Sequence, residues 1–294
     1  MYYRHAILLA LIKQCGGLLD KIRLQKLLFL FCNEQKKAAY TFVPYKFGCF
    51  SFQANADLLT LKKNGAVEEI ESNWKLRDNS NFESMLRDDD TLRLKNNIAR
   101  FAPMDNGELI RYTYVNFPFF AINSTIAQDY LNDRERAAVT RLRQTDPSPC
   151  LFTIGYEGKS LEVFLTELIK NGIALLCDVR KNAFSMKYGF SKSTLANACE
   201  NVGIKYFHTP ALGIESVERK NLNKKEDYVR LFEKYSKTVL NETKELQQNL
   251  RMQIQKAGRA ALMCFEADPE MCHRSYCASA LIAIADGNLP VIHL

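Results

Sequence analysis

The chain has 294 residues, of which 47% are hydrophobic and 25% charged, which is ordinary for a folded globular protein and excludes a disordered chain. We expect two domains at this length. No apolar run approaches the roughly 20 residues of a membrane-spanning helix, and the first residues lack a signal-peptide pattern, so we expect a cytoplasmic protein with no membrane partner. The net charge of +7 is compatible with a nucleic-acid partner but forms no strongly basic stripe.

The first eighty residues predict three helices followed by a hairpin. Apolar residues recur at helical spacing, Asp20 and Ser51 stand where N-caps are expected, and glycine follows the first and third helices. The hairpin alternates apolar and polar residues on both sides of a short polar turn. The predicted helices are Tyr3–Cys15, Lys21–Lys37 and Phe52–Asn64, and the predicted strands are Val67–Ile70 and Trp74–Arg77.

Three helices and a hairpin are the elements of a winged helix. Two stretches, Arg23-Leu-Gln-Lys-Leu-Leu28 and Tyr45-Lys-Phe-Gly-Cys-Phe-Ser51, resemble the Panacea or SocA-like antitoxin-related winged-helix families, over roughly residues 5–125. Such modules bind DNA in some proteins and other proteins elsewhere, so the resemblance implies DNA contact, with a protein-contact or purely structural role as the alternative. The third helix offers these residues to DNA: Gln53, Asn55, Lys62 and Lys63.

The middle of the chain predicts helices and then a domain boundary. The helices are Asp88–Phe101, Asn106–Tyr114 and a highly charged Asp133–Gln144. The polar, proline-rich stretch Asp146-Pro-Ser-Pro149 precedes an apolar strand, which is typical of a linker. We therefore expect one domain over residues 1–145 and a second over residues 150–294.

From Leu151 onward, strands and helices alternate regularly. This pattern predicts an α/β domain with a parallel sheet covered by helices on both faces, a Rossmann-like architecture. The predicted strands are Leu151–Ile154, Ile173–Val179, Ile204–Phe207, Ala260–Phe265 and Pro290–Leu294. The predicted helices are Ser160–Lys170, Ser191–Val202, Glu226–Lys256 and Cys272–Ala285.

Polar side chains follow four of these strands at the point where each strand ends. The carboxyl ends of parallel strands lie at one edge of the sheet, which is where α/β proteins keep their ligand sites. Convergence from four distant places in the sequence therefore predicts a functional site. The residues are Tyr156 and Glu157, Asp178 and Arg180, His208, and the group Glu266, Cys272, His273 and Arg274.

The same residues fall within motifs that resemble a known family. The motifs are Thr153-Ile-Gly-Tyr-Glu-Gly158, Asp178-Val-Arg180, Gly189-Phe-Ser191, Gly203-Ile-Lys-Tyr-Phe-His208, Leu212-Gly213 and Glu266-x-x-Pro-x-x-Cys-His-Arg274. In this order, over about residues 150–285, they are similar to domain-of-unknown-function family 488 (DUF488). The resemblance implies a compact α/β domain that acts on nucleic acid or nucleotides, without a settled reaction. The loop Arg180-Lys-Asn-Ala-Phe-Ser185 departs from the family because it lacks a proline between the arginine and the serine.

Glu266 is the first candidate for a reactive carboxylate, because cleavage of a base–sugar bond needs a negative charge beside an oxocarbenium-like sugar and an activated water. An ion pair with Arg180 or Arg274 is the structural alternative. Asp178 is the second catalytic candidate, unless it only fixes Arg180. His208 is the third, as a proton shuttle, with a hydrogen-bonded structural histidine as the alternative.

The other polar residues at the strand ends are candidates for substrate binding. Guanidinium groups suit the bidentate binding of phosphate, although buried salt bridges would use them equally well. The loop over residues 180–192 alternates lysines with aromatic residues, as a loop that follows a nucleic-acid backbone and stacks on bases would. A solvated loop is the alternative. The substrate-binding candidates are Tyr156, Glu157, Arg180, Lys187, Tyr188, Cys272, His273 and Arg274.

The nine cysteines show no paired spacing and are expected to be reduced, without disulfides. Cys272, at a helix start, is expected to have a lowered thiol pKa and could be a nucleophile, although buried packing is the commoner role of a cysteine. A zinc site from Cys272, His273 and Cys277 fails on spacing, because there is no C-x-x-C pair and neighbours on a helix point in different directions. We expect no metal and no cofactor.

These observations favour a two-domain enzyme that acts on DNA, with a winged helix on the duplex and a glycosylase-type hydrolase in the α/β domain. Defence of a host against foreign or modified DNA would be a natural setting. One alternative is a cysteine-dependent or nucleotide-directed enzyme at the same pocket. Another is a non-catalytic DNA-binding regulator that senses a small anionic ligand. The sequence does not specify an oligomeric state.

Overall fold

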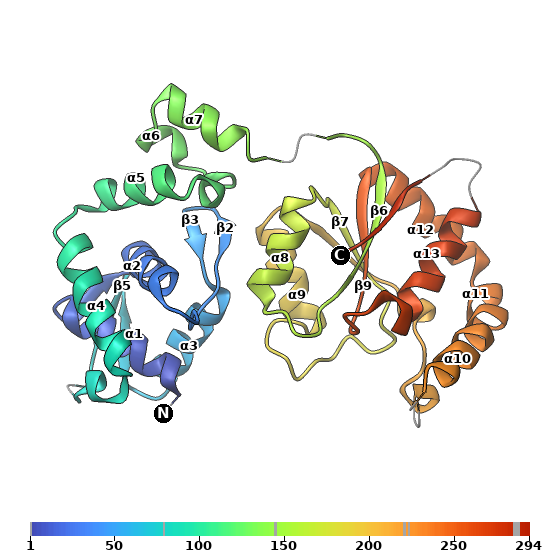
Figure 1. Ribbon diagram of the computed structural model, residues 1–294, viewed down its shortest axis with the longest axis horizontal. Coiled ribbons are helices and arrows are strands. Elements are labelled where there is room, and N and C mark those ends of the chain that lie inside the picture. The colour runs from blue at the N-terminus through green and yellow to red at the C-terminus, as the bar shows by residue number, and fades with distance from the viewer. Residues whose placement is uncertain (1, 79, 144–145, 220–221, 223, 285–288) are drawn as a thin grey trace. The chain divides into compact units, whose positions relative to one another are not determined.

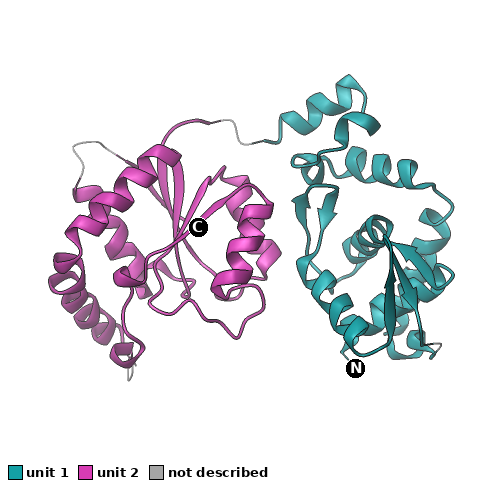
Figure 2. Ribbon diagram, turned by 180° about the vertical axis from the view of Figure 1, so that it is seen from behind, with its two compact units in different colours: residues 1–143 teal, residues 144–294 magenta. Residues whose placement is uncertain are grey.

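The computed structural model describes residues 2–78, 80–143, 146–219, 222, 224–284 and 289–294 (Figure 1). The chain divides into two compact units, residues 1–143 and 144–294 (Figure 2). Each unit has its own cluster of buried apolar side chains. Among the described residues, every helix is too short or too polar to span a membrane.

The first unit is built around three helices and a small antiparallel sheet. The helices are α1 (Tyr3–Gln14), α2 (Lys21–Glu34) and α3 (Phe52–Lys63), and the sheet has the order β1 (Leu18–Asp20), β5 (Asn73–Leu76), β4 (Val67–Ile70). Asp20 caps α2, since its side chain accepts hydrogen bonds from the backbone of Ile22 at 2.9 Å and Arg23 at 3.0 Å. Ser51 caps α3 in the same way.

Three short strands of this unit are absent from the sequence-based prediction. Strand β1 pairs with β5, more than fifty residues away, and β2 (Val43–Tyr45) pairs with β3 (Gly48–Phe50). Lys26 stabilises the turn between β2 and β3. Its buried ammonium group donates to the carbonyl oxygen of Phe47 and lies 4.8 Å from the ring centre of Tyr114. Burial lowers the pKa of Lys26.

The rest of the first unit is helical. Its elements are η1 (Phe82–Met85), α4 (Asp88–Phe101), α5 (Asn106–Asn116), η2 (Pro118–Ala121), α6 (Ala127–Tyr130) and α7 (Asp133–Thr140). Helices α4 and α5 begin where the sequence predicts. Helix α7 is shorter than predicted, and the predicted end at Gln144 lies outside the described residues.

The second unit is an α/β layer structure with a five-stranded, fully parallel sheet, as predicted. The strand order is β10 (Val291–His293), β6 (Cys150–Gly155), β9 (Arg259–Cys264), β7 (Leu175–Asp178), β8 (Lys205–His208). The helices are α8 (Leu161–Lys170), α9 (Lys192–Asn201), α10 (Lys225–Lys237), α11 (Val239–Glu242), α12 (Lys244–Ala257) and α13 (His273–Ala283). The predicted helix end at Ala285 lies outside the described residues.

The helices cover both faces of this sheet (Figure 1). Helices α8 and α9 lie on one face, and α10 to α13 lie on the other. The helices that follow β6 and β7, the two neighbours of β9, therefore lie on one face of the sheet. The helix that follows β9 lies on the other face. The strand order differs from that of the usual Rossmann fold, so the likeness to it is one of architecture only. Ligands of α/β proteins bind at the carboxyl ends of neighbouring strands whose following helices lie on opposite faces of the sheet.

The single long helix predicted over residues 226–256 is wrong, because the chain forms α10, α11 and α12 instead. The helical path is interrupted at Thr238 (φ −105°, ψ −85°) and again at Thr243. A continuous helix of this length would extend about 45 Å at 1.5 Å per residue, too far for a domain of this size. The breaks let the apolar side of each helix pack on the core that contains Phe232, Leu250 and Ile254.

Candidate active site

The carboxyl ends of the strands bring the predicted polar residues to one edge of the sheet. Asp178 lies in register with Met263 on one side and with His208 on the other, and Gly155 lies in register with Cys264. The segment after β9 then passes directly over the end of β6. A Cβ atom on Gly155 would lie 1.8 Å from the carbonyl oxygen of Glu266, so only glycine fits there.

Arg274 is fully buried and holds this segment in place. Its guanidinium group donates to the carbonyl oxygen of Glu266, to that of Ala267 at 2.9 Å and to the hydroxyl of Thr153 at 3.3 Å. The guanidinium N–H groups that were expected to bind a phosphate therefore form hydrogen bonds within the fold. Of the two roles weighed from the sequence, the geometry therefore favours the structural one, in which Arg274 positions Glu266.

Asp178 and Arg180 form a buried, bidentate ion pair. The guanidinium group donates to both oxygens of Asp178, at 2.9 and 2.6 Å, and to the hydroxyl of Tyr156 at 3.0 Å. Asp178 also accepts hydrogen bonds from the Arg180 backbone at 3.1 Å and from Tyr206 at 2.6 Å. The carboxylate is 0% exposed and surrounded by donors. This arrangement favours a structural pair over a reacting carboxylate and a phosphate-binding guanidinium.

Glu266 has a different environment. Its side chain is 18% exposed, and Oε1 lies 2.7 Å from the guanidinium of Arg219. Oε2 is buried and, within the described residues, has no hydrogen-bond partner. Burial acts to raise the pKa of Glu266, but attraction to Arg219 and the nearby thiol of Cys272 outweigh it, so the pKa lies below its usual 4.5. Glu266 is therefore ionised at neutral pH, with one oxygen uncommitted.

Cys272 and His273 lie beneath this carboxylate and are both buried. Burial and the neighbouring Cys264 hold the pKa of the Cys272 thiol well above 9.0. Since a thiol needs a lowered pKa to act as a nucleophile, this environment disfavours nucleophilic catalysis by Cys272. The Nε2 atom of His273 lies 3.1 Å from the carbonyl oxygen of Val179, and its Nδ1 atom faces Cys264.

The polar residues at the carboxyl ends of the strands are called the strand-end cluster below, and Tyr156 lies at one side of it. Its ring stacks on Phe190, with ring centres 4.3 Å apart, and packs edge-on against Phe265. Lys187 donates to the carbonyl oxygen of Tyr156 at 2.9 Å, and burial lowers the pKa of this lysine. The aromatic side chains of the predicted base-stacking loop thus differ in burial. Phe190 is buried within the fold, whereas Phe184 is 67% exposed.

The remaining predicted residues lie at the rim of this edge. His208 is half-buried, and its Nε2 atom lies 2.9 Å from the carbonyl oxygen of Arg180. Glu157 is exposed and accepts a hydrogen bond from the backbone of Ala267 at 3.0 Å. Tyr188 is 39% exposed. His208, Glu157 and Tyr188 are thus less buried than Asp178, Arg180 and Arg274.

The DNA-contact residues predicted on α3 do not share one environment. Gln53 donates to Asp57 at 2.8 Å, and Lys62 pairs with Glu69 at 2.6 Å. Asn55 is half-buried, and Lys63 is exposed. A ligand would have to break existing contacts to use Gln53 or Lys62, whereas Lys63 is directly accessible.

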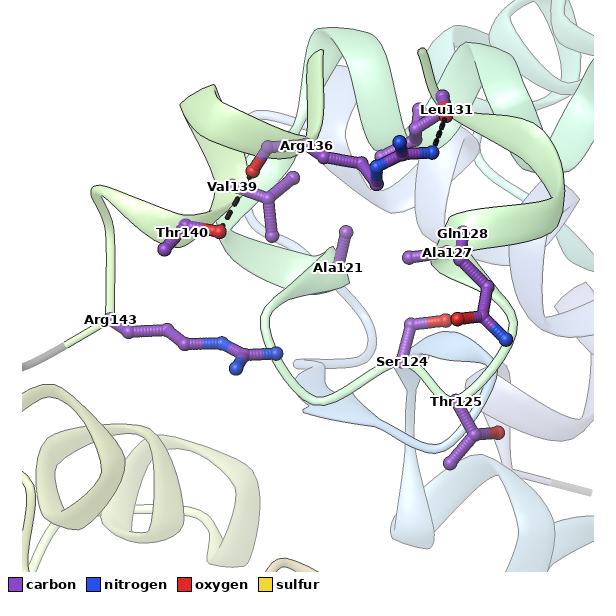
Figure 3. A pocket seen from close by; sticks show the side chains of 10 residues that line it. All are labelled: Ala121, Ser124, Thr125, Ala127, Gln128, Leu131, Arg136, Val139, Thr140 and Arg143. Carbon is purple, nitrogen blue, oxygen red and sulfur yellow. Dashed lines mark hydrogen bonds between the residues drawn. The ribbon is translucent and has the colours of Figure 1, made fainter. Parts of the chain in front are cut away.

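A hollow of about 190 Å³ lies in the first unit between η2, α6 and α7 (Figure 3). Two arginines line it, but both donate to backbone carbonyl oxygens of the fold: Arg136 to Leu131 at 2.9 Å and Arg143 to Ile122 at 2.6 Å. Both guanidinium groups therefore stabilise the backbone around the hollow. The strand-end cluster of the second unit is the stronger candidate site.

Comparison with known proteins supports the assignment of the second unit. Residues 160–281 match the family model described as domain of unknown function DUF488, which confirms that part of the resemblance seen in the sequence. No curated protein and no solved structure matches the chain. The matched region contains Asp178, Arg180, His208 and Glu266, whereas Tyr156 and Glu157 precede it.

Three residues of the cluster were missed by reasoning from the sequence. Arg219, in the short helix η4 (Ser216–Arg219), comes from a long loop whose path no local pattern reveals. Tyr206 lies inside a strand, where a tyrosine is usually a packing residue, yet its hydroxyl reaches Asp178. Cys264 ends an apolar strand and looked like part of the core. Its position at a strand end was the one available signal.

Removing one partner of the Asp178–Arg180 pair should be far more costly than removing both. Arg180→Met leaves a buried carboxylate uncompensated and should lower the free energy of unfolding by about 3–5 kcal/mol. Asp178→Leu should do the same, whereas the double variant should cost much less than the sum of the two. Urea denaturation of the three variants measures this coupling. Additive single effects would contradict the paired arrangement.

Arg219→Met should raise the pKa of Glu266, because burial then acts without its opposing charge. In the wild-type protein the ion pair contributes stability above the ordinary carboxyl pKa and loses it as the pH falls through the lowered value. A ¹³C-carboxyl NMR titration of glutamate-labelled protein measures the shift. Lys225→Met, which removes the partner of exposed Glu270, is the matched control and should leave Glu266 unchanged. An unaltered Glu266 midpoint in Arg219→Met would refute this electrostatic description.

Proposed function

We propose that the protein is a DNA-acting hydrolase that cleaves a base–sugar bond, with Glu266 as its reactive carboxylate. The observation that carries the proposal is the state of this side chain: ionised, partly buried, held at one oxygen by Arg219 and uncommitted at the other. Glu266 lies at the carboxyl end of β9, beside strands whose following helices lie on the opposite face of the sheet. This is the usual place for a ligand in this architecture.

The lowered pKa of Glu266 selects among the roles that a carboxylate plays in such a reaction. Cleavage of a base–sugar bond develops positive charge on the sugar, and a carboxylate that is ionised at neutral pH stabilises this charge or activates the attacking water. A general acid would need a raised pKa instead. Glu266 therefore acts as the charge-stabilising group or the base, and another group protonates the leaving base.

His208 is the proposed proton shuttle. Its Nε2 atom faces the carbonyl oxygen of Arg180, which can only accept, so Nε2 carries a proton and the other ring nitrogen is left to exchange one with the substrate. Asp178, by contrast, is surrounded by donors and serves to position Arg180 and Tyr206. The proposed mechanism thus uses one carboxylate rather than two.

Two other functions weighed from the sequence have less support. A cysteine-dependent reaction would need a reactive thiolate, but Cys272 is buried and its pKa is raised. Sensing of a small anion by Arg180 or Arg274 would need free guanidinium donors, but both groups are engaged within the fold. The partly exposed Arg219 is better placed to contact a phosphate of DNA beside Glu266.

We further propose that residues 3–76 form a winged helix that binds DNA. The chain order α1, β1, α2, α3, β4, β5 and the sheet order β1-β5-β4 support this assignment, with the β2–β3 hairpin as an insertion between α2 and α3. Helix α3 would then be the recognition helix. A cytoplasmic role in defence against foreign or modified DNA would be consistent with this combination.

Glu266→Gln should abolish base release while leaving DNA binding intact, because the amide keeps the shape of the carboxylate but not its charge. The rate of abasic-site formation should fall by roughly 10²–10⁴-fold. Glu270→Gln, an exposed substitution on the same segment, is the control and should retain full activity. Abasic sites are counted with an aldehyde-reactive probe, and binding is measured by fluorescence anisotropy. Equal rates for the wild-type protein and Glu266→Gln would rule out this role.

Lys63→Ala should weaken DNA binding uniformly across sequences and reduce the slope of log affinity against log salt by about one, as expected for one lost phosphate contact. Lys36→Ala removes a similarly exposed lysine from the end of α2 and is the control. Anisotropy titrations at several salt concentrations measure both slopes. If the two variants behave alike, α3 is not the DNA-contacting helix.

A further inference from the structure

Three buried side chains of the second unit form a compact set of soft ligand atoms. The Sγ atoms of Cys264 and Cys272 and a ring nitrogen of His273 all lie within 4.8 Å of one another, and all three residues are buried. Cys264 ends strand β9, Cys272 is the N-cap of α13, and His273 is the first residue of that helix. The set therefore joins the end of a central strand to the start of the next helix.

One distance within this set is close to that of a tetrahedral metal site. With zinc–sulfur and zinc–nitrogen bonds of about 2.3 and 2.0 Å, a sulfur and a nitrogen at two corners of a tetrahedron lie about 3.5 Å apart. The Sγ atom of Cys264 lies 3.8 Å from Nδ1 of His273. The other two pairs of ligand atoms also lie within 4.8 Å of one another, so an ion could be bound after side-chain shifts of up to about 1 Å.

The tautomer of His273 is also fixed in the form that a metal needs. Its Nε2 atom lies 3.1 Å from the carbonyl oxygen of Val179, which can only accept a hydrogen bond. Nε2 therefore carries the proton, and the lone pair of Nδ1 points toward the two sulfur atoms. A backbone carbonyl that orients the far nitrogen of a histidine in this way is the usual outer support of a metal ligand.

This set differs from the set of Cys272, His273 and Cys277 that was excluded on spacing in two respects. Cys272 has an extended backbone (φ −135°, ψ 134°) because it precedes the helix, so its side chain and that of His273 can face the same point. The third ligand comes from Cys264, at the end of β9, rather than from Cys277 on α13. A site of this kind has no C-x-x-C signature.

We propose that Cys264, Cys272 and His273 bind one divalent metal ion, and that two thiolates with one imidazole select Zn²⁺. Thiolate and imidazole ligands suit Zn²⁺, and three protein ligands leave the fourth position for another donor. Binding displaces the two thiol protons to solvent. This proposal does not depend on glycosidic activity, because metal binding is measured without DNA.

The competing explanation is a cluster of thiols hydrogen-bonded to an imidazole, with no affinity for metal. Titration of the full-length, chelator-treated protein with Co²⁺ distinguishes the two, since tetrahedral thiolate ligation gives intense visible bands and a sulfur-to-cobalt charge-transfer band. We expect one equivalent of Co²⁺ to produce these bands and one equivalent of Zn²⁺ to bleach them. A wild-type protein that shows neither overturns the proposal.

Variants identify the ligands. Cys264→Ala and Cys272→Ala should each weaken Zn²⁺ binding by at least about 100-fold, more than the loss of an outer support costs. Cys277→Ser, a buried cysteine on the same helix, is the control and should bind with unchanged affinity. Zn²⁺ should also raise the melting temperature of the wild-type protein and of Cys277→Ser, but not of the two ligand variants. Unchanged binding in either ligand variant, or its loss in Cys277→Ser, would overturn the assignment.

Discussion

The guanidinium group of Arg274 lies fully buried beneath the ends of β6 and β9, where it donates to the carbonyl oxygens of Glu266 and Ala267 and to the hydroxyl of Thr153. These carbonyl groups belong to an irregular segment that has no strand or helix to satisfy them, so the arginine provides the hydrogen bonds that regular structure would. Because Gly155 carries no side chain, the segment can lie directly on the sheet. The backbone of Glu266 is thereby held against the ends of β6 and β9.

The two ion pairs of the site differ in burial and in how completely the two charges satisfy each other. Asp178 and Arg180 satisfy each other completely in the interior, where leaving either charge unpaired would cost several kcal/mol. Glu266 and Arg219 form a single contact near the surface, so one carboxylate oxygen remains for chemistry. The first pair holds the ends of β7 and β8 in place, and the second presents an ionised group at the same edge.

Much of the second unit could be predicted from its sequence because its information is local. Apolar runs of strand length mark β6, β7 and β9, Ser160 caps α8 as expected, and parallel strands must place their carboxyl ends together. The match of residues 160–281 to DUF488 agrees with motifs that lie at these strand ends. The position of Glu266 at this edge followed from the same reasoning.

The parts that could not be predicted depend on contacts between distant residues. No local pattern indicates that Arg219 would pair with Glu266 rather than Arg180 or Arg274, since all three arginines are chemically equivalent in a sequence. The metal-type cluster was missed because Cys264 lies in an apolar strand and Cys272 was assumed to be helical. Strand β1 is three residues long and exists only through its pairing with β5.

The proposed release of bases from DNA at Glu266 can be tested without any variant. The most direct measurement incubates the full-length wild-type protein with double-stranded DNA of normal and of modified base content, and quantifies the low-mass products by mass spectrometry. We predict free nucleobase in an amount equal to the abasic sites left in the strand, with the phosphodiester backbone intact. DNA that retains all of its bases in every one of these substrates would contradict the claim.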